Sequence, residues 1–264
     1  MRQLAVNGGG INVVENGPPD GPAVVFVNSL GTDLRVWDDV LPRLPAGLRL
    51  IRYDKRGHGL STLEPASRTI EAHSADLAAV LDQLRVRAAL VVGLSIGGMI
   101  GQTLAVTRPD LVAGLVLLDT AHRIGPASNW DARIAAVRGG GLAAISESVM
   151  ERWFSAAFRR DQPGVVAAWR TLLERTPVEG YVAACEAVRD ADLSELSPRI
   201  TIPTRVAVGS EDQATPPELV RAAAALIKGA SFDLIEGTGH IPPAERPDLV
   251  AAIVRAQLEA LGRG

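Results

Sequence analysis

The chain has 264 residues, of which 47% are hydrophobic and 22% are charged. That length suits one large domain, or a domain with an insertion, and the composition excludes a disordered or collagen-like chain. The 27 basic and 30 acidic residues give a net charge of −3, which offers no support for nucleic-acid binding. Lys55 and Lys228 are the only lysines, so arginine supplies the other 25 basic residues. Because Ala, Gly and Pro are also plentiful, we attribute most of this bias to codon usage and not to anion binding.

Cys185 is the single cysteine, which excludes an intramolecular disulfide and a cysteine-based zinc site. The run 181–185 that contains it is typical of a buried helix position. The first ten residues hold no apolar signal-peptide core, and no stretch approaches about 18 consecutive apolar residues. We therefore expect a soluble cytoplasmic protein without a membrane partner.

Short apolar runs bounded by turn residues predict the strands of one sheet. Two candidates come first, at 4–6 and 11–15. The next run, Ala23–Val27, is apolar without interruption, which is typical of a strand buried on both faces of a parallel sheet. Runs of the same kind recur at 48–53, 88–92, 112–118, 204–208 and 231–235.

Helical periodicity fills the intervals between these runs, at 70–84, 96–107, 217–227 and 247–261. Strands that alternate with helices predict an α/β fold with a doubly wound, mostly parallel sheet. Residues 123–198 break this rhythm, because they carry helical sequence, no convincing strand and three of the four tryptophans. We interpret them as a helical cap inserted into a core of 1–122 and 199–264. Such a cap covers the carboxyl ends of the strands, where ligands of open α/β sheets bind.

The candidate nucleophile is Ser95, which stands in the pattern Gly93-x-Ser95-x-Gly97 between a predicted strand and a predicted helix. A serine on such a sharp turn has a strained backbone, and the small residues on either side prevent clashes. The alternative is a phosphate-binding loop, which would need a lysine and a serine or threonine after its last glycine. No lysine follows here, so the pattern favours a catalytic serine.

A serine hydroxyl needs a base, and the base needs an acid that orients it. Of the four histidines only His240 follows every candidate acid and lies in a loop before the final helix. Asp212, which comes after a buried strand, is the expected acid, and Asp119 after the preceding strand is the alternative. Asp54 is interpreted as a structural residue that ties a turn. For the developing oxyanion, the expected donors are the N–H groups of Ile96 and Leu30.

These motifs resemble the α/β-hydrolase superfamily over essentially the whole chain. Within it, the chain is similar to the 3-oxoadipate enol-lactonases of the β-ketoadipate route of aromatic degradation. The closer resemblance rests on the segments 28–33, 52–59, 93–102, 130–133, 151–154 and 214–217 together with Trp37. Asn28-Ser-Leu-Gly-Thr32 is the most specific of them. The family tends to carry Ser-Asn after the histidine, whereas here Ile241-Pro242 follows, as in esterases generally.

The resemblance implies that Ser95 opens a lactone through an acyl-enzyme that water then hydrolyses. We expect no metal and no cofactor, because His240 and His58 lack partner ligands at metal spacing and no cofactor motif is present. The family's substrate carries a carboxylate, and Arg133 in the predicted cap is the one arginine whose position suits a substrate ligand. A solvated Arg133 is the alternative. Trp130 and Trp153 are expected to line the substrate pocket.

Other functions stay open at this point. They are an esterase or lactonase for a larger neutral substrate, C–C bond hydrolysis, perhydrolysis, and a ligand receptor that keeps the fold without turnover. Enzymes of this fold that use an aspartate nucleophile are excluded, because Ser95 stands where they need the carboxylate.

Overall fold

The computed structural model describes residues 1–263. Its eight strands form one sheet in the order β1-β2-β4-β3-β5-β6-β7-β8. β2 pairs antiparallel with both β1 and β4, and all the other neighbours pair in parallel. The strands are β1 (Arg2–Val6), β2 (Gly9–Asn16), β3 (Ala23–Val27), β4 (Arg49–Tyr53), β5 (Ala89–Leu94), β6 (Val112–Leu118), β7 (Thr204–Gly209) and β8 (Ser231–Ile235).

The central strands explain the uninterrupted apolar runs. Every residue of β3 and β5 is buried. Because successive side chains of a strand point to opposite faces, complete burial means that both faces of the sheet are covered. The predicted fold class is confirmed, and the predicted strands and core helices lie within two residues of the observed ones. The largest strand differences are in β1 and β2 and at the end of β5. β1 is an edge strand with mostly exposed side chains, so little apolar signal marks its start.

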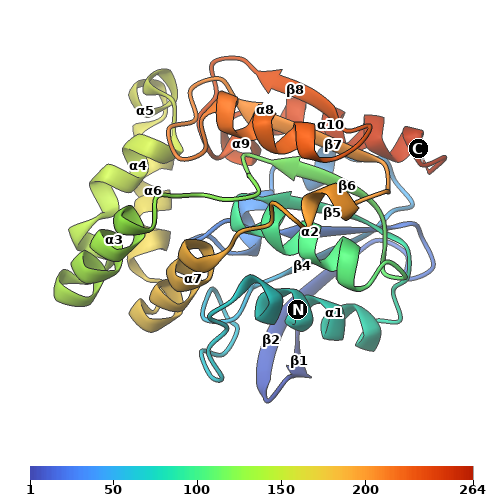
Figure 1. Cartoon of the computed structure of the whole chain (residues 1–264), viewed down its shortest axis with the longest axis horizontal. Helices are drawn as coiled ribbons and strands as arrows, with labels where there is room; N and C mark the ends of the chain where they lie inside the picture. Colours follow the sequence, from blue (N-terminus) through green and yellow to red (C-terminus); the bar gives the residue numbers. More distant parts are fainter. Residues whose placement is uncertain (264) are drawn as a thin grey trace.

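The helices of the core pack closely on this sheet. α2 contacts β3, β5 and β6 and also packs on α1, whereas α10 contacts β6 and β7 (Figure 1). α8 lies against β7 and β8. The core helices are α1 (Ile70–Gln83), α2 (Ile96–Thr107), α8 (Pro217–Leu226), α9 (Pro242–Glu245) and α10 (Pro247–Ala260).

A group of five helices, hereafter the cap helices, separates β6 from β7 in the sequence. They are α3 (Ala127–Gly140), α4 (Ser146–Trp153), α5 (Ala156–Asp161), α6 (Pro163–Glu174) and α7 (Val178–Asp190). Figure 1 shows them together at one end of the sheet, the end toward which the arrowheads of β6 and β8 point. The interval therefore folds without a strand, as its sequence pattern indicates. Cys185 is buried on α7, and burial raises the pKa of its thiol to about 12.

Candidate active site

Ser95 occupies a sharp turn between β5 and α2. Its φ is 57° and its ψ is −121°, in a region that residues with a Cβ rarely adopt. The flanking glycines make the turn possible: a Cβ on Gly93 would lie 2.4 Å from the Gly97 carbonyl oxygen. On Gly97 it would lie 2.1 Å from the carbonyl oxygen of Val27. The end of β6 holds the turn, since Leu118 accepts a hydrogen bond from the Ser95 N–H at 2.9 Å.

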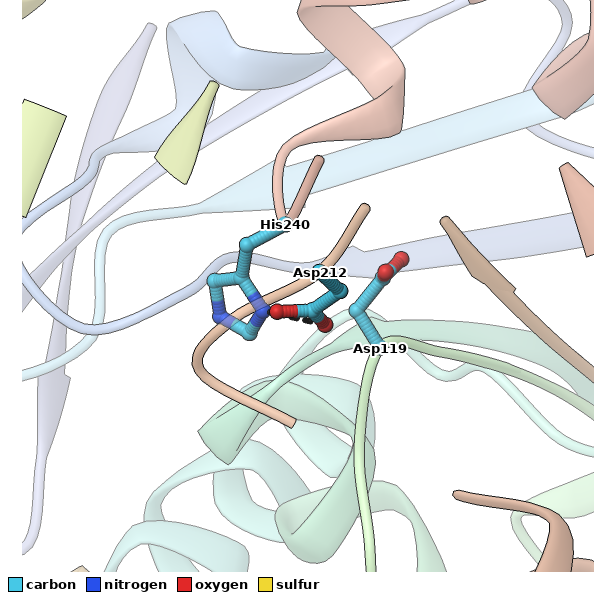
Figure 2. A group of neighbouring side chains, drawn as sticks. All are labelled: Asp119, Asp212 and His240. Carbon is cyan, nitrogen blue, oxygen red and sulfur yellow. Dashed lines mark hydrogen bonds and ion pairs between the residues drawn. The ribbon is translucent and has the colours of Figure 1, made fainter. Parts of the chain in front are cut away.

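Asp212 and His240 form a buried hydrogen-bonded pair (Figure 2). Asp212 follows β7, His240 follows β8, and His240 Nδ1 lies 2.8 Å from Asp212 Oδ2. Thr215 donates its hydroxyl to Oδ2 at 2.6 Å, while the N–H groups of Ala214 and Thr215 donate to Oδ1 at 2.7 and 3.0 Å. Burial opposes ionisation, but His240 and these donors outweigh it and lower the pKa of Asp212. Asp212 is therefore an ionised acceptor for the imidazole.

Asp119 lies directly beside this pair, and Figure 2 shows its carboxyl group next to that of Asp212. Its Oδ1 accepts from the Gly209 N–H at 2.9 Å, and no partner is found for the buried Oδ2 among residues 1–263. Burial and the neighbouring charge of Asp212 raise the pKa of Asp119 well above its usual value. A protonated Asp119 can donate to Asp212. Among residues 1–263 the hydrogen-bonded carboxylate partner of His240 is Asp212, and no hydrogen bond or ion pair joins His240 to Asp119, the alternative acid.

The three side chains also bear on metal binding, because one potential ligand atom of each lies within 4.8 Å of the others. The arrangement of charges does not suit a cation. Asp212 and His240 already bond to each other through the atoms that face one another, and Asp119 is driven to its neutral form. The donor set fits a chain of hydrogen bonds better than a metal centre.

Ser95 and His240 line one cavity of about 260 Å³ between the sheet and the cap helices. The predicted residues Leu30, Trp130, Arg133 and Trp153 line the same cavity. A larger cavity of about 660 Å³ lies under α6 and contains neither Ser95 nor His240, so we place the chemistry in the smaller one. The other residues that line the smaller cavity are Ser29, Ile124, Gly125, Asn129, Val149, Arg152, Tyr181, Gln213, Ala214, Thr215, Pro216 and Leu219.

Two arginines, Arg133 and Arg152, face this cavity, whereas the sequence pattern points to Arg133 alone. Arg133 on α3 lies over the Trp130 ring, with its guanidinium carbon 4.8 Å from the ring centroid. Arg152 comes from α4. Within residues 1–263 neither has a carboxylate within 4.0 Å. Burial and the positive charge of Arg133 lower the pKa of Arg152. The cavity wall therefore carries two positive charges that an anionic ligand would balance.

The two expected oxyanion donors also border the site. Ile96 is the first residue of α2, where a backbone N–H has no partner within the helix. Leu30 lies in the loop after β3 and lines the cavity. No acceptor for its N–H is found among residues 1–263. Gly31 follows with a φ of +74°, a conformation that favours glycine.

The loop that carries His240 is hydrogen-bonded to the end of α4, one of the cap helices. The N–H groups of His240 and Ile241 both donate to the carbonyl oxygen of Trp153, at 2.8 and 3.2 Å. Glu245 adds a second connection, because its carboxylate accepts from the Gly239 N–H at 2.9 Å and the Ser155 hydroxyl at 2.6 Å. Burial raises the pKa of Glu245. The end of α4 and the histidine loop are thus one hydrogen-bonded unit.

Comparison with known proteins decides the family. The sequence profile of the alpha/beta hydrolase family matches residues 24–253. This chain belongs to that family. The hydrolase is 33% identical to 3-oxoadipate enol-lactonase 2 of Acinetobacter baylyi, over 94% of this chain and 93% of the relative. It is 34% identical to 3-oxoadipate enol-lactonase 1 of the same organism, over 78% and 77%.

Among solved structures, the hydrolase matches the enol-lactonase from Burkholderia xenovorans LB400 with a TM-score of 0.94. The two are 35% identical, and the match covers 98% of this chain and 100% of the other. The resemblance found in the sequence is confirmed, both to the superfamily and within it to the enol-lactonases. No helix in the described part of this hydrolase is long and apolar enough to cross a membrane.

Proposed function

We propose that this hydrolase opens a carboxylate-bearing enol-lactone of the 3-oxoadipate type through an acyl-enzyme on Ser95. The observation that carries the proposal is the pair of arginines without carboxylate partners, Arg133 and Arg152, in the cavity that Ser95 and His240 line. The names of the relatives from Acinetobacter baylyi and Burkholderia xenovorans support the same substrate class.

In the proposed reaction, His240 takes the proton of the Ser95 hydroxyl as the serine oxygen attacks the lactone carbonyl carbon. Asp212 holds His240 through the 2.8 Å hydrogen bond and stabilises the imidazolium that forms. The N–H groups of Leu30 and Ile96 bind the negative oxygen of the tetrahedral intermediate. Collapse of this intermediate breaks the ring C–O bond, and the His240 imidazolium returns its proton to the enolate, which remains part of the acyl chain and becomes a ketone. Water, deprotonated by His240, then cleaves the acyl-enzyme and yields the diacid.

The proposed role of the arginines is to bind the substrate's free carboxylate. A charge-assisted hydrogen bond to a guanidinium contributes about 1.5–3 kcal/mol, roughly twice a neutral one. Trp130 and Trp153 contribute apolar surface to the same cavity. A cavity of about 260 Å³ favours a small, compact lactone over a large neutral ester. We propose that residues 123–198 act as the cap that encloses this substrate over a core of 1–122 and 199–264.

The test is turnover of a carboxylate-bearing enol-lactone and of a small neutral aryl ester by the wild type and three variants. Ser95→Ala should abolish both activities and covalent labelling by a fluorophosphonate. Arg133→Ala and Arg152→Ala should each raise KM for the anionic lactone about tenfold and leave the neutral ester unchanged, since each removes one charge-assisted contact. Equal effects on both substrates would remove the arginines from this role. A wild-type protein that neither reacts with the fluorophosphonate nor turns over either substrate would indicate a ligand receptor.

A further inference from the structure

Lys55 is a buried lysine that the proposed chemistry leaves unexplained. It follows β4, is 1% exposed, and donates from Nζ to the carbonyl oxygen of Ser29 at 2.6 Å. Among residues 1–263 no carboxylate lies within 4.0 Å of Nζ. The neighbouring Asp54 is occupied elsewhere, since it accepts from Asn12, Leu34 and Leu60. Burial of an ammonium group without an ion-pair partner is costly, so the contact with Ser29 needs a reason.

The Ser29 carbonyl belongs to the same peptide unit as the Leu30 N–H. A trans peptide is planar, and its C=O and N–H point in opposite directions. Lys55 fixes the carbonyl side from the core, and the Thr32 hydroxyl donates to the same oxygen at 2.9 Å. The Leu30 N–H is therefore directed away from the core lysine, while Leu30 and Ser29 both line the cavity of Ser95.

A second contact fixes the next peptide. The Gly31 N–H donates to Nε2 of His58 at 3.1 Å, so the loop is anchored on both sides of Leu30. Gly31 cannot serve as an oxyanion donor while it makes this bond. The anchors on the Ser29 carbonyl and the Gly31 N–H thus fix the loop, while the Leu30 N–H stays free within residues 1–263.

We propose that Lys55 is a positioning residue of the oxyanion hole, which orients and polarises the Ser29–Leu30 peptide. Its positive charge on the carbonyl oxygen draws electron density through the amide and makes the Leu30 N–H a stronger donor. This effect grows as negative charge develops on the substrate oxygen, so it acts on the transition state more than on bound substrate. The inference rests on the proposed function, because it presupposes that Leu30 binds the oxyanion.

The charge of Lys55 is sensitive to pH near neutrality. Burial lowers the pKa of Lys55 to about 7, against the opposing effect of Asp54 and Asp33. The histidines that face it, His58 and His73, are held neutral, because burial and the lysine charge lower the pKa of each. Lys55 thus carries its charge below about pH 7 and loses it above. We expect kcat of the wild type to fall as the pH rises through this range.

The test uses Lys55→Met, which keeps an unbranched side chain without the terminal ammonium group. Lys228→Met is the control, because Lys228 is the other lysine and is exposed. Lys55→Met should lower kcat about 10- to 100-fold, less than the roughly 10²–10³-fold loss of a direct oxyanion donor, with KM changed less than about twofold. It should also lack the alkaline fall in kcat. Affinity for a boronic acid that forms a tetrahedral adduct with Ser95 should weaken in parallel with kcat, while the diacid product binds as before.

Wild-type kcat in Lys55→Met, or equal weakening of boronate and product binding, would overturn the proposal in favour of a structural lysine. If the variant does not fold, the wild type still decides, since a kcat that stays constant from pH 7 to about 9 is incompatible with the titration of Lys55. Turnover by Ser95→Ala would instead refute the proposed function, whatever Lys55 does. The two failures are therefore distinguishable.

Discussion

The neighbouring carboxyl groups of Asp212 and Asp119 allow the same substitution to be made twice with opposite expected results. In Asp212→Asn the amide oxygen should take the place of Oδ1, because the N–H groups of Ala214 and Thr215 point there. The amide NH₂ then faces His240 Nδ1, at the position of a 2.8 Å bond. An NH₂ group donates and does not accept, so the imidazole must carry its proton on Nε2. That tautomer cannot take the proton of Ser95.

We therefore expect Asp212→Asn to lower kcat about 10⁴-fold, which corresponds to about 5 kcal/mol of lost transition-state stabilisation. In Asp119→Asn the amide oxygen can keep the bond from the Gly209 N–H, and the NH₂ replaces the proton of the neutral acid toward Asp212. Its kcat should stay within about threefold of the wild type, because one donor replaces another. Steady-state rates on the enol-lactone at several pH values measure both variants.

An Asp119→Asn enzyme as inactive as Asp212→Asn would refute this reasoning, because it would mean that Asp119 acts as a charged acid. More than about a tenth of wild-type kcat in Asp212→Asn would equally contradict the tautomer argument. Unfolding measurements on both variants exclude misfolding as the cause.

Three further predictions concern stability. Burial raises the pKa of Asp119 in the folded state, so its contribution to folding stability is complete below the pKa of the unfolded state and is lost as the pH rises through the folded-state pKa. In thermal unfolding, the Tm of Asp119→Asn should therefore rise relative to that of the wild type as the pH increases. Gly31→Ala, at φ +74°, should lower the free energy of unfolding by about 1–2 kcal/mol; denaturant titration should show no such loss in Gly164→Ala, where the added Cβ meets no atom within 4 Å. Glu245→Ala leaves the Gly239 N–H without its acceptor and should lower the free energy of unfolding by about 1–3 kcal/mol in the same titration. An unchanged midpoint would contradict a stabilising role for the hydrogen bonds that Glu245 accepts.

The sheet could be predicted because its signals are local. Ala23–Val27 and 112–118 are uninterrupted apolar runs, and they begin and end as strands where the sequence predicts them. The sharp turn at Ser95 could be predicted for the same reason, since a strand–serine–helix pattern lies in consecutive residues. His240 and Asp212 followed from their order along the chain and from the strands that precede them.

Residues whose role depends on packing between distant segments could not be predicted. Arg152 has the same neighbours in sequence as many exposed helix residues, and only the packing of α4 turns it toward the cavity. Lys55 meets Ser29 across 26 positions, and Glu245 meets Ser155 across 90. The sequence therefore singles out Arg133 alone, although Arg152 lines the same cavity. The arginine-rich composition likewise gives no sign that Arg56 is buried in an ion pair with Asp76.

The hydrogen bonds from His240 and Ile241 to the Trp153 carbonyl limit how the enclosure can open. If the end of α4 swung outward, the N–H groups of His240 and Ile241 would lose their shared acceptor, and the imidazole would no longer be held in register with Asp212. We therefore expect substrate to enter through movement of other cap helices, with this end of α4 held in place. The end of α4 thus both borders the cavity and holds the proposed base, His240. We expect that a variant in which this end of α4 is displaced would admit substrate but fail to hydrolyse it.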